Sequence, residues 1–441
     1  MFLLTDVSCR KKMQMFDFLF LVLLYLLVGL LVQSERRLFD TWITPVTVLA
    51  VPYLAVVMLV NIFGVSLGFY SFHPPSTSVW ILGLLLFWLS GWVIAFPFMQ
   101  GRMRSEIRRR PFRFEPAAQK WALMLLWVII PLVAFRLLTL LNSMGGLSAL
   151  ANDEFSRRYG SGFFAHLLTF GYPLLILLIG TVRRHQLLIL LTIGITLALI
   201  FVYQVKSWII VPLTAGMIYR WLSGRMEITP KLIPRAALLM VVLFFGSYLV
   251  TFGVRNPALL LEPAVYQFLS GHFMHYLFAG VMALSEYART SVTVEPTPDQ
   301  VFAPFVNLYN FLVGQTVISA LNEQFIPISV AGRTSNVFTL FGSLFMALGW
   351  LGGMLYTIAM GVIIYTIYLA VRLNRNSWFA VLWAYLAAML ALGWFDFYFW
   401  NLAALEASVY CVLIGVVFAF LGENRTTHKP EVTTAAESSV S

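Results

Sequence analysis

One segment near the middle of the chain holds most of the ionisable side chains that lie outside long apolar runs. It extends from Val254 to Thr339. Histidines and carboxylates can take a proton from a hydroxyl group, and guanidinium groups match the geometry of phosphate oxygens. The spacing does not choose a general base among the histidines and carboxylates. The candidates in this segment are Arg255, His272, His275, Glu286, Arg289, Asp299, Glu323 and Arg333.

A second group of cations precedes this segment. Arg157 and Arg158 follow Asp153 and Glu154, and Lys206 stands between two apolar runs. Paired arginines next to a membrane would suit a diphosphate, although local pairing with the two acidic residues is an equal alternative. Lys206 either marks a substrate path or extends toward the lipid headgroups. If the helices converge, these three cations and Arg255 form one anion site.

The sequence gives little support for a metal or a cofactor. His272 and His275 are three residues apart and can share a helical face, but no third ligand stands in register with them. Cys9 and Cys411 are far apart, so we expect no disulfide. No Gly-x-x-x-x-Gly-Lys-Ser/Thr loop for ATP is present. We therefore expect neither a metal nor a cofactor.

Composition assigns the chain to the membrane proteins. Of its 441 residues 60% are hydrophobic and 11% are charged, and the mean hydropathy is +0.85. Soluble domains have about 25% charged residues. The net charge of +10 comes from short loops between apolar runs, which indicates membrane topology and not nucleic-acid binding.

Hydropathy predicts an all-α polytopic membrane protein with about 11 transmembrane helices and one large loop. We divide the chain into N-terminal transmembrane helices (1–253, about eight), the large loop with interfacial helices (254–339), C-terminal transmembrane helices (340–421, about three) and a disordered tail (422–441). The run 340–371 is too long for one straight crossing, so its first part is predicted to be re-entrant or a half-helix. The predicted spans are 16–33, 41–63, 78–98, 119–141, 163–181, 186–204, 207–223, 236–253, 340–371, 377–394 and 399–421.

Charge predicts the orientation of these spans. The arginines at 36–37, 102–113, 183–184, 225–235 and 372–375 fall on one side, which the positive-inside rule makes cytoplasmic. The large loop then faces the opposite side. Arg10, Lys11 and Lys12 disagree with this scheme, and a translation start at Met13 or Met15 would remove the conflict.

Two stretches resemble a known family. The run Gly332–Thr339 reads Gly-Arg-Thr-Ser-Asn-Val-Phe-Thr and is followed by Leu348-Gly-Trp-Leu-Gly-Gly. It resembles the signature that ends the long periplasmic loop of Wzy-type O-antigen and exopolysaccharide polymerases, although Leu348 replaces a usual aromatic residue. Gly145-Gly146 followed by Arg157 is similar to the first periplasmic loop of that family. Lys206 occupies a position where the family often has an arginine, and lysine keeps the charge but loses the bidentate geometry.

The resemblance implies a metal-independent, GT-C-like glycosyltransferase at the periplasmic face of a bacterial inner membrane. Its substrates would be oligosaccharide repeat units linked to undecaprenyl diphosphate, and a hydroxyl of one unit would displace the lipid diphosphate of another. Membrane lipids and a chain-length-determining co-polymerase are the other implied partners. The leaving diphosphate would be stabilised by five cations, namely Arg157, Arg158, Lys206, Arg255 and Arg333.

Several residues have two interpretations under this resemblance. Tyr159, Tyr266 and Tyr276 could stack on sugars, or they could belong to an aromatic belt at the membrane interface. Asn336 could hydrogen-bond to sugar or help position Arg333, or it could cap a helix that begins near Val337.

Two other functions fit the same pattern. An O-antigen-ligase-like transferase would use the same donor but pass the glycan to a lipid-A core. A flippase of the lipid-linked unit would be a transporter and not an enzyme, and it should show internal repeats or charged, interrupted helices near the middle of the membrane. The Asn-Val-Phe-Thr run favours the polymerase.

Overall fold

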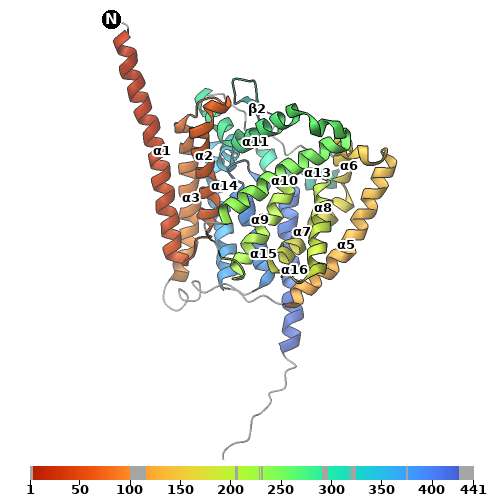
Figure 1. Cartoon of the computed structure of the whole chain (residues 1–441). Coiled ribbons are helices and arrows are strands. Elements are labelled where there is room, and N and C mark those ends of the chain that lie inside the picture. Colours follow the sequence, from red (N-terminus) through yellow and green to blue (C-terminus); the bar gives the residue numbers. More distant parts are fainter. Residues whose placement is uncertain are drawn as a thin grey trace, which may run out of the picture.

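The computed structural model describes residues 3–99, 116–203, 207–227, 229, 232–290, 296–316, 318, 324–373 and 376–426. Within these ranges the chain is mainly α-helical, with a single short hairpin formed by β1 (Ile326–Pro327) and β2 (Thr334–Ser335). The helices form one bundle that is crossed at one end by α11 (Pro263–Thr290) (Figure 1). We call this the α11 end.

Eight described helices are long and apolar enough to cross a membrane. Hydrocarbon offers no hydrogen-bond partners, so a chain of this composition satisfies its backbone within helices. The structure thus confirms an all-α polytopic membrane protein. The eight spans are Asp17–Phe39, Pro45–Phe63, Pro74–Phe98, Pro116–Ser143, Phe163–Thr181, Ala237–Val254, Leu340–Leu373 and Leu402–Phe420.

These spans belong to α1 (Leu3–Phe39), α2 (Pro45–Phe63), α3 (Thr77–Ala95), α5 (Pro116–Ser143), α7 (Phe163–Thr181), α10 (Leu232–Arg255), α14 (Leu340–Leu373) and α16 (Leu402–Thr426). Three apolar helices are shorter, namely α8 (Leu187–Phe201), α13 (Ala303–Val313) and α15 (Ser377–Ala391). The remaining helical elements are α6 (Asp153–Tyr159), α9 (Ser207–Leu222), α12 (Pro298–Val301), η1 (Val65–Leu67), η2 (Pro74–Ser76), η3 (Phe96–Met99), η4 (Gly146–Ala151), η5 (Pro257–Leu261) and η6 (Tyr398–Trp400).

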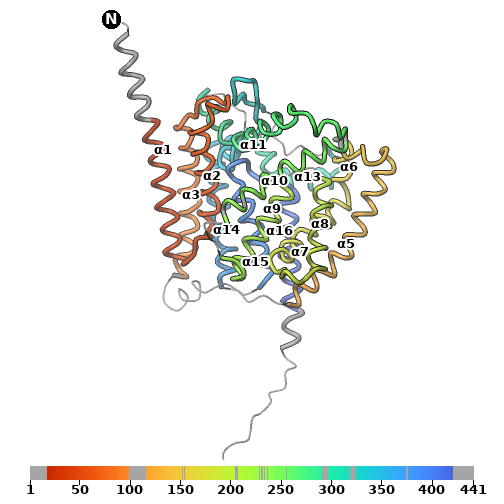
Figure 2. The backbone as a smooth tube through the Cα atoms, in the orientation of Figure 1, coloured from red at the N-terminus to blue at the C-terminus, as the bar shows by residue number. Residues whose placement is uncertain are grey.

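The segment between α10 and α14 covers the α11 end. It contains α11, α12, α13 and the hairpin, and α11 contacts α2, η2 and both strands (Figure 2). Helix α10 differs from the other spans because it runs obliquely across the face of α8 and α9 (Figure 1), and only 6% of its apolar window is buried.

Helices α3 and α14 pack with their backbones in close contact, and glycine makes this approach possible. A Cβ on Gly361 would lie 2.1 Å from Ser90 Oγ, and one on Gly91 would lie 2.2 Å from the Tyr365 ring. Small residues of this kind drive helix association in membranes because lipid is as apolar as a leucine side chain.

The long helix α14 is interrupted. Gly349 has φ 68° and ψ 177°, so the helix breaks between its buried first part and the part that follows. This break was expected for a run too long for one crossing. The helix begins at Leu340, and Thr339 caps it by accepting the backbone N–H of Gly342 at Oγ1 (3.3 Å). The alternative that Asn336 caps a helix beginning near Val337 is therefore wrong.

Polar contacts join the helices at the opposite end. The buried carboxylate of Glu35 accepts the backbone N–H of Val46 (3.1 Å) and the hydroxyl of Tyr365. The buried Arg372 guanidinium donates to the carbonyl of Phe39 (3.0 Å). These bonds connect α1 and α2 to α14 through side chains that would be costly to bury without partners.

The packing of α3 on α14 predicts the effect of a single substitution. Gly361→Val should lower the melting temperature of the detergent-solubilised protein by several degrees, because overpacking costs about 1–3 kcal/mol. Gly29→Ala is the control, since nothing lies within 4 Å of a Cβ at that glycine. Equal melting of Gly361→Val and the wild type would contradict this packing.

Candidate functional site

Helix α11 is fixed to the start of α3 by a polar network. Ser285 Oγ accepts the backbone N–H of His73 (2.8 Å), and Arg289 donates to the carbonyl and the hydroxyl of Ser71. Arg289 also lies 3.4 Å from the buried Glu286 carboxylate, and burial raises the pKa of that carboxyl group. Glu286 and Arg289 therefore have a positioning role in this structure.

The middle of α11 carries a cluster of histidine and tyrosine side chains, which we call the histidine cluster. The rings of His272 and His275 lie parallel with centroids 6.0 Å apart, which confirms that they share a helical face. Tyr276 lies edge-on to His272 at 5.0 Å, and Tyr248 of α10 does so at 5.2 Å. Tyr276 also stacks on Phe395 of the α15–α16 loop at 5.8 Å.

Arg333 reaches the histidine cluster from the hairpin. Its guanidinium carbon lies 5.5 Å from the centre of the Phe69 ring, and Nη1 donates to the Gly271 carbonyl (3.3 Å). Burial and the charge of Arg333 together lower the pKa of His275. The Nδ1 atom of His275 is buried without a hydrogen-bond partner among the described residues. The site thus combines a positive charge with a histidine that is held neutral near pH 7.

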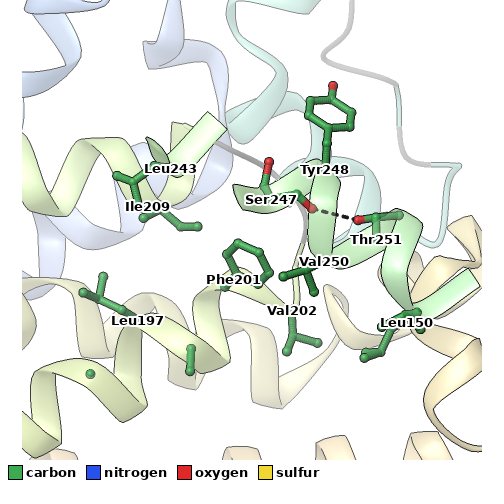
Figure 3. Close-up of a pocket in the computed structure, with 13 residues that line it drawn as sticks. Leu150, Leu197, Phe201, Val202, Ile209, Leu243, Ser247, Tyr248, Val250 and Thr251 are labelled. Atoms are coloured by element: carbon green, nitrogen blue, oxygen red, sulfur yellow. Dashed lines mark hydrogen bonds between the residues drawn. The ribbon is translucent and has the colours of Figure 1, made fainter. Parts of the chain in front are cut away.

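An apolar cavity of about 590 Å³ lies between the oblique helix α10 and helices α8 and α9. Figure 3 shows Phe201 and Val202 facing Val250 across this cavity, whereas Tyr248 points away from them. Since the Tyr248 ring contacts His272, helix α10 connects the cavity to the histidine cluster. A largely apolar cavity of this size is suited to an acyl or prenyl chain.

The segment 142–162, which carries Arg157 and Arg158 and which we call the cationic loop, lies at one edge of this cavity. Leu150 of η4 lines the cavity, and η4 contacts both α6 and α10. Arg158 forms an ion pair with Glu154 (2.5 Å), as the local-pairing alternative predicted, and Arg157 is exposed. Helix α10 ends at Arg255, directly after the cavity residue Val254. Helix α6 and the hairpin lie apart in Figure 1, so Arg157 and Arg158 do not share a site with Arg333.

The three predicted sugar-stacking tyrosines have different environments. Tyr159 is 2% exposed and donates its hydroxyl to the Leu199 carbonyl (3.1 Å). Its assignment to sugar binding is therefore corrected, because its ring belongs to the core. Tyr266 is 47% exposed and donates to the Leu260 carbonyl (2.8 Å), and Tyr276 belongs to the histidine cluster.

Two further candidates lie on other elements. Asp299 is exposed in the first turn of α12, and Asn336 is half-buried between β2 and α14. Lys206 and Glu323 lie outside the described residues. Among the described residues, no group of three or more histidine, cysteine or acidic side chains could hold a metal ion.

A polar cleft that sequence reasoning missed lies between the first turns of α7 and α16. His166 Nδ1 is 2.8 Å from Glu406 Oε1, and this pair borders a space of about 210 Å³. In the sequence, Glu406 is an ionisable residue early in an apolar run, and nothing near it in the chain indicates His166 as its partner. The available signal was an ionisable residue near the start of two different apolar helices.

Comparison with protein families identifies one match. Residues 68–427 match the family of unknown function DUF6337, and the chain belongs to this family. No curated protein and no solved structure matches the chain.

The environment of His275 predicts a pH dependence of stability. Its folded pKa lies below the ordinary value of 6.5, so the unfolded chain binds the proton more readily. Stability should therefore fall as the pH drops through about 6.5 toward 5, and His275→Gln should reduce that fall. Melting temperatures measured between pH 8 and pH 5 test this.

The exposed His185 lies at the opposite end and provides the matched control. His185→Gln should keep the pH profile of the wild type. A profile unchanged by His275→Gln would show that His275 is not held neutral in the folded protein.

Proposed function

We propose that the protein is a polymerase that joins undecaprenyl-diphosphate-linked oligosaccharide repeat units at the α11 end, which faces the periplasm. The observation that carries this proposal is the apolar cavity under α10, whose edge meets the cationic loop of α6. A lipid diphosphate needs such a pair of environments, one for its prenyl chain and one for its charged head.

The position of the cations supports binding of the head group near the cavity. Arg157 and Arg158 follow η4, which contributes Leu150 to the cavity wall. Arg255 ends the helix that forms the opposite wall. A glycan transfer leaves negative charge on the departing diphosphate, and fixed cations beside it would lower the barrier.

The distribution of charge supports the orientation. Helix α1 ends, and α7 connects to α8, at the end of the bundle opposite α11 (Figure 1). Arg36 and Arg37 are in the last turn of α1, and Arg183 and Arg184 lie between α7 and α8. Under the positive-inside rule that end is cytoplasmic. With α8, α9 and α15 included, the chain would cross the bilayer about eleven times in a GT-C-like arrangement.

The resemblance of Gly332–Thr339 to the polymerase signature supports the assignment of Arg333. In the structure this run connects the hairpin to α14 and places the guanidinium of Arg333 next to α11. Arg333 would bind a second anionic group or a sugar at the histidine cluster.

A genetic experiment tests the proposal. Cells that lack this chain should show single, unpolymerised repeat units on a gel of surface polysaccharide, and the wild-type gene should restore the ladder. Arg333→Ala should fail to restore it. The exposed Arg184 at the opposite end gives the control Arg184→Ala, which should restore the ladder fully.

The same gel distinguishes the alternatives. Loss of every unit from the lipid-A core, with long polymer still on its lipid carrier, would indicate a ligase. Repeat units retained on the cytoplasmic side would indicate a flippase. An unchanged ladder in the deletion would contradict all three functions.

Two glycines give a sharper test of the cavity. A Cβ at Gly194 or at Gly246 would meet nothing within 4 Å, but only Gly194 lines the cavity. Gly194→Leu should fill space needed by the prenyl chain and shorten the ladder, whereas Gly246→Leu should leave it unchanged. Equal ladders from two stably expressed variants would show that the cavity does not hold the lipid.

A further inference from the structure

We infer that the cleft between α7 and α16 binds the acceptor sugar, with His166 as the general base and Glu406 as the residue that positions it. This inference rests on the proposed polymerase function and assigns its second substrate site. His166 does not lie in the large loop. The inference therefore depends on the structure and not on the sequence signature.

The His166–Glu406 pair places one imidazole nitrogen next to a carboxylate. Nδ1 of His166 lies 2.8 Å from Glu406 Oε1, so Nε2 is the nitrogen left for the acceptor hydroxyl. The His166 side chain is 48% exposed and that of Glu406 is 19% exposed. The base is therefore accessible from the cleft, while the carboxylate that orients it is more enclosed.

The walls of the cleft suit a sugar ring. Tyr172, Tyr203 and Trp208 provide aromatic surface, and Asn401 provides an amide that can both donate and accept hydrogen bonds. The volume of about 210 Å³ is below the range typical of sites that enclose a whole drug-sized ligand. The cleft thus fits one terminal sugar of a longer, lipid-linked unit.

Stability alone does not explain the pair. Ion pairs with exposed members contribute little to stability, typically below about 1 kcal/mol. An ionisable residue within an apolar span is costly and is by default a candidate for function. Here two such residues, from helices far apart in sequence, meet beside an open cleft at the α11 end.

Aromatic stacking links the cleft to the histidine cluster. Tyr276 stacks on Phe395, and Phe395 lies 6.5 Å from Tyr398 in a near-parallel arrangement. Tyr398 lines a small space next to the cleft, together with Tyr172 and Asn401. The rings of Phe395 and Tyr398 therefore connect the two regions by direct packing.

The chemical step moves one proton and one glycosyl group. The acceptor hydroxyl gives its proton to Nε2 of His166, and its oxygen forms a bond to the anomeric carbon of the donor. The bond from that carbon to the diphosphate oxygen breaks, and the lipid diphosphate leaves with the electron pair. His166 then returns its proton to water or to the released diphosphate. Glu406 stabilises the imidazolium that exists between these two proton transfers.

Other titratable groups surround the pair and share its electrostatic environment. Tyrosines face the pair from α7, from the segment after α8, from α15 and from α16 itself. The guanidinium carbon of Arg136 lies 5.9 Å from the ring centre of Phe164, two positions before His166. Helix α13 also packs against α16. The tyrosines on these elements are Tyr172, Tyr203, Tyr385, Tyr410 and Tyr309.

Reconstituted full-length protein tests the inference. The probe is the lipid extract of cells that lack the chain, which contains the natural unpolymerised units, and the measurement is the initial rate of polymer formation against pH. His166→Gln should lower the rate by about 100-fold or more, the usual contribution of a general base. Glu406→Gln should lower the rate without lowering the melting temperature, because the imidazole loses the carboxylate that lies next to Nδ1.

Two exposed residues provide matched controls for these changes. His185→Gln and Glu262→Gln replace the same side chains outside the cleft and should keep the rate and the pH profile of the wild type. Melting temperatures of all four variants verify folding. If His166→Gln does not fold, the rate of a folded Glu406→Gln decides the question.

The outcomes separate this inference from the proposed function. A wild-type protein that forms no polymer from the extract would overturn the polymerase and this site together. A wild-type protein that polymerises, with a folded His166→Gln of nearly equal rate or a folded Glu406→Gln of unchanged rate, would overturn only the acceptor site. In that case the pair would serve to join α7 to α16.

Discussion

The close contact between α3 and α14 determines where the rest of the α11 end can lie. Glycines at 83, 91 and 361 leave no room for a side chain between these helices, and hydrophobic burial gives little drive for association within lipid. The first residues of α14 are held in turn, because Trp80 donates to the Thr339 hydroxyl (2.9 Å) and the Leu340 N–H donates to the Gly393 carbonyl (2.6 Å). The hairpin with Arg333 directly precedes this fixed point, so its position follows from the packing of the two helices.

Helix α10, in contrast, packs loosely against its neighbours. It is the least buried of the membrane-spanning candidates and lies obliquely against its neighbours, which leaves a cavity where a straight helix would have packed. Val250 faces the cavity (Figure 3), and Tyr248, which also lines it, contacts the ring of His272. A protein that admits a long apolar ligand from the bilayer needs one loosely packed wall, and the structure supplies it next to its cationic loop.

Sequence reasoning predicted the helical class well, because that class depends on local hydropathy. Helix α10 ends at Arg255 and α14 begins at Leu340, close to the predicted limits of 254 and 339. The shared face of His272 and His275 was predictable from helical spacing. Three other features were not predictable from the sequence, because each depends on a neighbour in the folded structure. They are the burial of Tyr159, the capping role of Thr339 and the pairing of His166 with Glu406. Glu406 lies 240 positions after His166, and nothing local to either residue indicates the other.

The positions of the ionisable groups bear on the choice between an enzyme and a transporter. In the described part of the chain, the polar clusters gather near the two ends of the bundle: Glu35 with Tyr365 and Arg372 at one, and Arg333, His275, Asp396 and the His166–Glu406 pair at the other. A proton-coupled transporter needs ionisable residues between these levels. A transferase needs them at one face only, where both of its lipid-anchored substrates present their sugars. The arrangement therefore favours chemistry at the α11 end over transport between the two ends.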